Sequence, residues 1–263
     1  MELKNKIVWI TGASSGIGEA LCYKLNQAGV KLIISSRNSE GLYQVKNKCT
    51  NNQLDVHVLP LDLENSPELE EKANTALNIF GRIDMIIHSG GVSQRSLAMD
   101  TDLDVAQKIM NINFWGAVIL TKALIPSMLS NQSGHIVIIS SLVGKFGTKY
   151  RSAYSASKHA LHGYFDSLRS EIDPGIKISI ICPGFIKTNV TINALTADGT
   201  RQNTMDDAQA NGMSADECAA QIIKAIKSRK EEVYIGGKEK YAVLIKRFLP
   251  GIFSKLARKA KVT

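Results

Sequence analysis

A tyrosine and a lysine four residues apart, Tyr154 and Lys158, have the types and the spacing needed for proton transfer. In a helix, two such side chains lie about one turn apart on the same face. An ammonium group beside a phenol favours the phenolate, so we expect the Tyr154 pKa to fall below its usual value of about 10, toward neutral pH. Ser141 ends the apolar run 135–140 and is placed to hold a substrate oxygen against the tyrosine. A Tyr-x-x-x-Lys pair alone is weak evidence for a catalytic site, because such pairs are common on the solvated faces of helices.

Strand-like and helix-like stretches alternate along the chain, and this alternation would bring these residues together. Short apolar runs predict strands, and apolar residues every three or four positions predict amphipathic helices. The expected strands cover residues 6–10, 31–35, 56–61, 83–88, 136–140, 177–182 and 232–235. The expected helices cover residues 16–28, 39–50, a stretch with Ser66 as N-cap, 103–129, 152–172 and 214–228. This rhythm predicts an α/β fold, a doubly wound parallel sheet of about seven strands with helices on both faces. Because no linker-like stretch interrupts it, residues 1–263 are expected to form a single domain.

Glycines join the first expected strand to the first expected helix, in Thr11-Gly12-Ala13-Ser14-Ser15-Gly16-Ile17-Gly18. Glycines permit a tight turn and let backbone amides approach a pyrophosphate, whose charge the helix N-terminus favours. The spacing differs from the usual Gly-x-Gly-x-x-Gly, and an ordinary turn is the alternative. After the second strand, where an acid often binds ribose hydroxyls, the sequence reads Ser35-Ser36-Arg37-Asn38. Arg37 can pair with a 2′-phosphate, which favours NADP(H) over NAD(H), unless its guanidinium is merely solvated.

Length and composition exclude several classes of protein. The 263 residues are 44% hydrophobic, which argues against disorder. We expect no membrane span, because no run approaches about 18 apolar residues, and no signal peptide, because residues 1–6 lead directly into a strand. The four cysteines lie apart without metal-ligand spacing, so we expect reduced thiols, no metal site and a cytoplasmic location. The net charge of +8 is compatible with nucleic-acid binding. Because no motif of aromatic and basic residues that could stack on bases accompanies this charge, we expect no nucleic-acid partner.

Five motifs together resemble the short-chain dehydrogenase/reductase family, in its single-domain branch, over about residues 6–235. They are the turn 11–18, Asn113 within Asn111-Ile112-Asn113-Phe114-Trp115-Gly116, Ser140-Ser141, the stretch from Tyr154 to Lys158, and Pro183-Gly184-Phe185-Ile186-Lys187-Thr188. The segment Gly91-Val92-Ser93-Gln94-Arg95-Ser96 is similar to that of the member-seven subgroup, relatives of the 11-beta-hydroxysteroid dehydrogenases. Members of that subgroup often reduce steroid or retinoid carbonyls, and they usually carry an N-terminal membrane anchor. We do not expect such an anchor here, and we therefore do not assign the subgroup's substrates to this chain. The resemblance implies a Rossmann-like fold and hydride transfer between a nicotinamide and an alcohol or carbonyl.

The resemblance also implies a role for each matching residue. In the reducing direction Tyr154 would donate a proton to the carbonyl oxygen, and Ser141 would orient that oxygen. Lys158 would bind the nicotinamide ribose and lower the Tyr154 pKa, and Asn113 would hold a water that relays protons to Lys158. The implied cofactor contacts are Gly12, Ser14, Ser15, Gly16, Ile17, Gly18, Arg37, Asp62 at the adenine, Leu63, Ser89, Gly90, Asn113, Tyr154, Lys158, Pro183, Gly184, and Ile186 and Thr188 at the carboxamide.

The chain departs from the family pattern after the fourth expected strand. There His88-Ser89-Gly90-Gly91 replaces the usual Asn-Asn-Ala-Gly. Both asparagine side chains, which brace the neighbouring strand in the family, are missing. His88 is either a second active-site base or, as we favour, a strand-end histidine with a local hydrogen bond.

Two further segments lie outside the repeating pattern. Residues 189–213 are polar and follow a strand at the edge where open sheets bind ligands, so we interpret them as a mobile substrate lid, with a plain surface insertion as the alternative. Residues 238–263 form a basic amphipathic tail that Pro250-Gly251 divides. The tail can cover the pocket or a neighbouring subunit, which we favour, or lie on an anionic membrane surface. Relatives assemble through helices equivalent to 103–129 and 152–172, so we expect a homodimer or homotetramer.

Three functions compete. The leading one is an NADP(H)-dependent oxidoreductase that interconverts a small-molecule carbonyl and a secondary alcohol, with Tyr154 as general acid/base. The alternative is a cofactor-binding protein of the same fold with a regulatory role, against which the complete set Asn113, Ser141, Tyr154 and Lys158 argues. A nucleotide-sugar epimerase shares the Tyr-x-x-x-Lys pair, but its glycine turn is spaced differently and its C-terminal region is usually larger.

Overall fold

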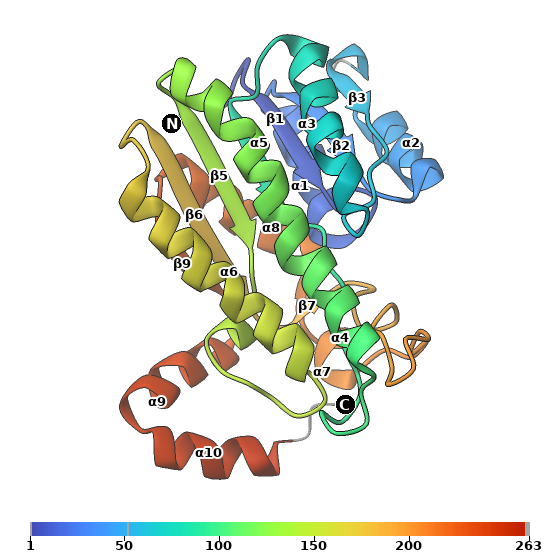
Figure 1. Cartoon of the computed structure of the whole chain (residues 1–263), viewed down its shortest axis with the longest axis vertical. Helices are drawn as coiled ribbons and strands as arrows, with labels where there is room; N and C mark the ends of the chain where they lie inside the picture. The colour runs from blue at the N-terminus through green and yellow to red at the C-terminus, as the bar shows by residue number, and fades with distance from the viewer. Residues whose placement is uncertain (1, 52, 261–263) are drawn as a thin grey trace.

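A seven-stranded parallel sheet runs through the computed structural model, which describes residues 2–51 and 53–260 (Figure 1). The strands are β1 (Ile7–Thr11), β2 (Lys31–Ser35), β3 (Val56–Val58), β4 (Met85–His88), β5 (Gly134–Ile139), β6 (Ile176–Pro183) and β9 (Glu232–Ile235). Their order is β3-β2-β1-β4-β5-β6-β9, and every neighbouring pair is parallel. The expected doubly wound α/β fold is therefore confirmed.

Helices cover both faces of the sheet, because successive strand residues point to opposite sides. In β1, Trp9 joins the core beneath α3, α5 and α6, whereas Val8 and Ile10 join the core beneath α1, α2 and α8. Figure 1 shows α5 and α6 in front of the sheet and α1 and α8 behind it. The helices are α1 (Gly16–Gln27), α2 (Ser39–Lys48), α3 (Ser66–Phe80), α4 (Leu103–Met110), α5 (Gly116–Ser130), α6 (Ser152–Glu171), α7 (Asp207–Ala210), α8 (Ala215–Lys227), α9 (Ala242–Phe248) and α10 (Pro250–Lys259), and a small separate sheet pairs β7 (Ile186–Lys187) with β8 (Met213–Ser214).

The third strand is shorter than predicted. It ends at Val58 rather than at residue 61, although the amides of Leu59 and Leu61 still donate to the carbonyls of Ile34 and Ser36. Asp62 therefore lies beyond the strand and not at its end. In the next element Asn65, and not Ser66, is the N-cap of α3.

The long helix predicted over 103–129 is interrupted by a π-helical turn. Helix α4 continues into the π turn Asn111–Trp115 and then into α5. Such turns are rare and occur mostly at functional sites. Contrary to our expectation, the combined segment Leu103–Ser130 is long and apolar enough to qualify as a membrane span, although half of its most apolar window is buried. The helix packs against the sheet through buried side chains such as Leu120 and Leu124, and core helices pass the same test, so this finding is weak support for a span.

The strand order reverses between β1 and β4, since the chain builds β2 and β3 outward on one side and β4, β5 and β6 on the other. In open parallel sheets, the connections at such a reversal diverge and leave a crevice beyond the carboxyl ends of the strands. The glycine turn after β1 and the segments after β4 and β5 all lie at this edge. The fold therefore brings the predicted site residues to one place.

Candidate functional site

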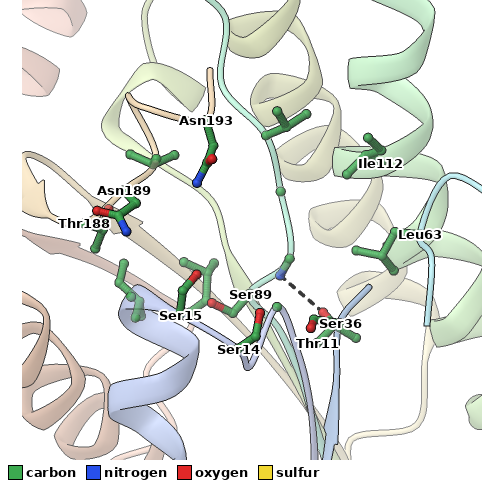
Figure 2. Close-up of a pocket in the computed structure, with 18 of the residues that line it drawn as sticks. Thr11, Ser14, Ser15, Ser36, Leu63, Ser89, Ile112, Thr188, Asn189 and Asn193 are labelled. Atoms are coloured by element: carbon green, nitrogen blue, oxygen red, sulfur yellow. Dashed lines mark hydrogen bonds between the residues drawn. The ribbon is translucent and has the colours of Figure 1, made fainter. Parts of the chain in front are cut away.

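The glycine turn after β1 adopts a conformation that only glycine accepts readily. Gly12 and Gly16 have φ angles of +67° and +59°, in the left-handed region. A Cβ atom on Gly12 would lie 2.6 Å from the backbone of Gly90, after β4. The two turns thus approach each other backbone to backbone, and the Gly90 amide donates a hydrogen bond to Thr11 Oγ1 at 3.3 Å (Figure 2).

A cavity of about 1010 Å³ lies at this edge of the sheet. Of the residues predicted from the sequence, it is lined by Gly12, Ser14, Ser15, Gly16, Ile17, Arg37, Asp62, Leu63, Ser89, Gly90, Ser141, Tyr154, Lys158, Pro183, Gly184, Ile186 and Thr188. Figure 2 shows Ser14, Ser15 and Ser89 close together at the glycine turn, with Asn189 and Asn193 of the segment 189–213 across from them. The structure therefore gathers residues from seven separate stretches of sequence around one space.

Gly18 and Asn113 are the two predicted residues that do not line the cavity. A Cβ atom on Gly18 would lie 2.2 Å from the Gly12 carbonyl oxygen, so Gly18 allows α1 to pack against the turn. Asn113 lies buried in the π turn, where its Oδ1 accepts from the Val92 amide at 2.8 Å and its Nδ2 donates to the Val92 carbonyl at 2.9 Å. The Asn113 amide also donates to Ser157 Oγ at 3.0 Å, one residue before Lys158. Its side chain thus joins the segment after β4 to helix α6, and its proposed water relay stays a prediction.

Helix α6 and the end of β5 position the three residues expected to do chemistry. Tyr154 and Lys158 lie in the first two turns of α6, and Lys158 Nζ donates to the Ile139 carbonyl, the last residue of β5, at 2.9 Å. Ser141, two residues after β5, interacts with the Tyr154 hydroxyl, and its Oγ donates to the Pro183 carbonyl at 3.4 Å. The lysine, the serine and the tyrosine therefore converge from two elements, as the motif predicted.

The electrostatics of this group differ from the expectation. Burial raises the Tyr154 pKa above its usual value, although the hydrogen bond with Ser141 and the positive charges of Arg151 and Arg95 act in the opposite direction. Burial also lowers the Lys158 pKa to about 8. The predicted fall in the Tyr154 pKa through Lys158 is thus wrong for the chain alone, because Lys158 Nζ lies 5.8 Å from the centre of the tyrosine ring and desolvation outweighs the neighbouring charges.

Arg37 and Asp62 line the other end of the cavity. Arg37 Nε lies 4.0 Å from Asp62 Oδ1, and about half of each side chain is exposed. A contact this long between exposed groups is weak and leaves the guanidinium available to a ligand. Lys48, at the end of α2, also lines this part of the cavity and adds a second positive charge that the sequence reasoning did not single out.

His88 has the local hydrogen bond that we favoured. Its Nε2 lies 2.9 Å from Thr121 Oγ1 of α5, and burial lowers its pKa to about 3. His88 does not line the cavity, and so it is not placed as an active-site base. The His88–Thr121 contact links β4 to α5, where the family pattern would have had an asparagine.

Two buried residues that the sequence reasoning left without a role hold the catalytic helix. Gln94 Oε1 accepts from the backbone amides of Ala153 at 2.7 Å and Tyr154 at 3.3 Å, and so satisfies the first turn of α6. Arg95 donates from Nε to Asp206 Oδ2 at 2.9 Å, and Arg151 Nη2 donates to the same oxygen at 3.2 Å. Gln94 and Arg95 belong to the motif 91–96, but only the fold shows that they contact α6 and the segment 189–213.

The segment 189–213 is folded over the cavity rather than separate from it. Asn189, Val190, Asn193, Leu195, Gly199, Arg201 and Gln209 line the cavity. Apart from the short helix α7, the segment is irregular, as the sequence indicated, and it is anchored by Asp206. The segment therefore covers the cavity, as a lid would. That it moves stays a prediction.

Comparisons with known proteins identify the family of the chain. The family model described as short chain dehydrogenase matches residues 6–198. The chain is 38% identical over 268 residues to dehydrogenase/reductase SDR family member 7B of Xenopus tropicalis, covering 98% of this chain and 87% of that protein. It is 40% identical over 240 residues to member 7 of Homo sapiens, covering 89% and 71%.

Solved structures share the fold. A short-chain dehydrogenase from Streptomyces avermitilis has a TM-score of 0.80 at 26% identity, covering 97% of this chain and 96% of that one. A short-chain dehydrogenase/reductase from Burkholderia phymatum in complex with NAD has a TM-score of 0.84 at 21% identity, covering 100% and 98%. An alcohol dehydrogenase from Thermococcus sibiricus complexed with 5-hydroxy-NADP has a TM-score of 0.77 at 22% identity, covering 89% and 97%. The family model and these relatives show that the chain belongs to the short-chain dehydrogenase/reductase family, whose members are oxidoreductases acting on CH–OH groups.

Proposed function

We propose that the protein is an NADP(H)-dependent oxidoreductase that interconverts a small-molecule carbonyl and a secondary alcohol, with Tyr154 as the general acid/base. The observation that carries this proposal is that Ser141, Tyr154 and Lys158 line the same cavity as the glycine turn 11–18. Proton-transfer groups and a phosphate-binding turn in one space are what a dehydrogenase requires. The regulatory alternative gains nothing from the structure, since the catalytic set is complete.

The residues present fit a nicotinamide dinucleotide. The positive φ angles of Gly12 and Gly16, and the absence of a Cβ atom where Gly12 meets Gly90, leave backbone amides open toward the cavity at the start of α1. Such a turn at a helix N-terminus favours a pyrophosphate. When bound, the nicotinamide supplies or accepts the hydride.

The chain's own residues manage the proton. We assign Tyr154 Oη as the group that gives its proton to the carbonyl oxygen during reduction, and Ser141 Oγ as the group that orients that oxygen. Burial keeps the Tyr154 hydroxyl protonated, and efficient proton donation would need a pKa closer to the working pH. Lys158, fixed by the Ile139 carbonyl, would bind the nicotinamide ribose and favour the phenolate once the proton has left.

The preference for NADP(H) rests on Arg37. Its guanidinium lines the cavity and is half exposed, and Lys48 lies in the same part of the lining. Arg37 and Lys48 would bind a 2′-phosphate, although each lies 4.0 Å from an acid that also lines the cavity, Asp62 for Arg37 and Glu19 for Lys48. We keep NAD(H) as the alternative cofactor.

We also propose a homodimer or homotetramer that assembles through α5. Trp115 and Leu129, at the two ends of this helical stretch, are each 44% exposed, and such an assembly would cover them. Light scattering of the wild type and of Trp115→Glu tests this assembly. A monomeric wild type would overturn it.

Cofactor titrations followed by nicotinamide fluorescence test the proposed function. We expect Arg37→Ala to weaken NADPH binding at least tenfold, the loss of a charge-assisted hydrogen bond, and to leave NADH binding nearly unchanged. Tyr154→Phe should bind NADPH normally but lose at least a hundredfold in turnover on a panel of carbonyl compounds. Equal binding of both nucleotides by the wild type would contradict the NADP(H) preference, and full activity of Tyr154→Phe would contradict the catalytic assignment.

A further inference from the structure

The tail helices α9 and α10 leave a row of large apolar side chains in solvent. Tyr241, Leu244, Phe248, Leu249, Ile252 and Leu256 are each more than half exposed, and we call these six residues the tail stripe. Within residues 2–51 and 53–260, only seven other large apolar side chains are comparably exposed, spread over the rest of the chain. Single exposed apolar side chains are ordinary, but a contiguous group of this size indicates an interaction site.

The tail stripe is a second apolar face, separate from the one that attaches the tail to the protein. Val243 of α9 and Phe253 of α10 are buried, and the Phe253 ring packs against Phe146 at 5.1 Å between centroids. Leu244 and Phe248 of α9 are four residues apart, as are Ile252 and Leu256 of α10, so each pair projects together on one side of its helix. Tyr241 precedes α9, and Leu249 lies between the two helices. Packing within the chain, which the sequence led us to favour, therefore covers one face of the tail and leaves the other open.

Basic residues border the stripe along both helices. At 100° per residue, Lys255 and Lys259 project beside Ile252 on α10, and Arg247 projects beside Leu244 on α9. Lys240 lies in the turn that precedes α9. Residues 240–263 contain seven lysines and arginines and no aspartate or glutamate. The apolar stripe thus has a positively charged border with no internal counter-charge.

This combination favours an anionic lipid surface over a second copy of the chain. Two tails packed stripe to stripe would bring their lysines and arginines together without an acid to neutralise them. An interface of anionic phospholipids satisfies both features, because acyl chains accept the apolar side chains and headgroups accept the cations. We propose that α9 and α10 bind the protein to an anionic membrane surface through the tail stripe and its basic border.

A second exposed apolar segment lies at the same end of the molecule. Met99, in the loop before α4, and Leu103, the first residue of α4, are 88% and 86% exposed. Figure 1 shows this loop reaching the end at which α10 lies. The Asp102 amide at the end of this loop donates to the Ala197 carbonyl of the segment 189–213. The membrane-facing end is therefore the end that carries the cover of the cavity.

Vesicle sedimentation tests this proposal independently of the proposed reaction. The vesicles are phosphatidylcholine alone and phosphatidylcholine with roughly one third phosphatidylserine, an anionic surface of physiological character, each at low and high salt. The variants are Phe248→Ser/Ile252→Ser in the stripe and Lys255→Gln/Lys259→Gln in its border. The matched control, Lys122→Gln/Lys224→Gln, removes the same charge from exposed positions on α5 and α8. Thermal unfolding checks that each variant is folded.

We expect the wild type to sediment with the anionic vesicles at low salt, to be released by high salt, and to ignore neutral vesicles. The border variant should bind roughly tenfold more weakly or worse, since each basic residue near an anionic surface contributes several-fold, and the control should bind like the wild type. The stripe variant should fail to bind. The proposal is overturned if the wild type ignores anionic vesicles, if the control loses as much affinity as the border variant, or if the stripe variant changes only the oligomeric state.

Discussion

Among individual residues, Lys158 shows the sharpest conflict between stability and function. The side chain is 5% exposed, and its burial lowers the ammonium pKa to about 8. The hydrogen bond from Lys158 Nζ to the Ile139 carbonyl does not restore the hydration that a charged amine has in water. We infer that the chain tolerates an unfavourable charge there because a cofactor and Tyr154 need it.

Replacing Lys158 by methionine should therefore stabilise the folded protein at neutral pH. In the unfolded chain the lysine pKa is about 10.4, so below pH 8 both states are protonated and only the folded state bears the desolvation of the charge. Between pH 8 and 10.4 the unfolded state holds more protons, and wild-type stability rises with pH. We expect Lys158→Met to raise the free energy of unfolding by about 1–3 kcal/mol at pH 7, allowing for the lost hydrogen bond, and by little near pH 10.4.

Urea unfolding of both proteins at pH 7 and near pH 10 measures this difference. A variant that is less stable than the wild type at pH 7 would show that the Ile139 hydrogen bond outweighs desolvation. The same variant should bind NADPH more weakly, since the residue lines the cavity.

Gly18 gives a second prediction for a single residue. A Cβ atom there would lie 2.2 Å from the Gly12 carbonyl oxygen, which belongs to rigid backbone. We expect Gly18→Ala to destabilise the fold by about 1–3 kcal/mol, as overpacking does. Gly163→Ala is the matched control, because it lies within α6 with no atom within 4 Å of the added Cβ, and it should stabilise by about 0.5–1 kcal/mol. Denaturant unfolding compares the two, and equal effects would contradict the close packing of α1 on the turn.

Among the elements, the segment 189–213 depends on a buried cluster of charges. Arg95 and Arg151 both donate to Asp206, and the exposed fractions of the three side chains are 5%, 7% and 2%. Burial favours the neutral acid, yet the bonds from Arg95 and Gln202 and the charges of the two arginines hold the Asp206 pKa below its usual range. Because Arg151 is the N-cap of α6, the cluster ties the cover of the cavity to the catalytic helix.

Removing the carboxylate of this cluster should destabilise the fold more than removing one of its arginines. We expect Asp206→Ala to destabilise the fold by about 3–5 kcal/mol, because it removes the acid that two buried arginines share, and Arg95→Ala to cost less, because Asp206 keeps its ion pair with Arg151. The double variant should lose less than the two single losses together. The exposed pair Lys24–Asp216, at 2.7 Å, is the control, and its coupling should stay below about 1 kcal/mol. Similar coupling energies for both pairs in urea unfolding would contradict a structural role for Asp206.

Local patterns predicted the elements well and the contacts between them poorly. The apolar runs placed most strands within two residues, because a buried parallel strand is apolar along its length. The π turn around Asn113 could not be predicted, since it depends on how α4 and the turn itself pack on helix α6. Arg95 and Asp206 are 111 residues apart, and no spacing rule pairs them. The direction of the Tyr154 pKa shift could not be predicted either, because the burial that causes it depends on the whole fold.

In the molecule as a whole, two buried histidines make stability depend on acid. His88 of β4 and His135 of β5 lie on adjacent central strands, and burial lowers their pKa values to about 3 and about 4. Each keeps one neutral-ring hydrogen bond, His88 with Thr121 and His135 with Ser179, at 2.9 Å. Neither ring can take up a proton without disturbing the centre of the sheet.

The free energy of unfolding should therefore fall as the pH drops below 6.5. The unfolded chain protonates both histidines near pH 6.5 while the folded chain keeps them neutral, so the unfolded state holds more protons. We expect a loss of about 1.4 kcal/mol per pH unit for each histidine, continuing to about pH 4 for His135 and about pH 3 for His88. His135→Gln, which can still hydrogen-bond Ser179, should remove about half of this slope, whereas His159→Gln, at an exposed position on α6, should leave it unchanged. If urea unfolding between pH 7 and 5 shows the same slope for both variants, His135 does not titrate on global unfolding, and the central strands would have to open locally to admit protons.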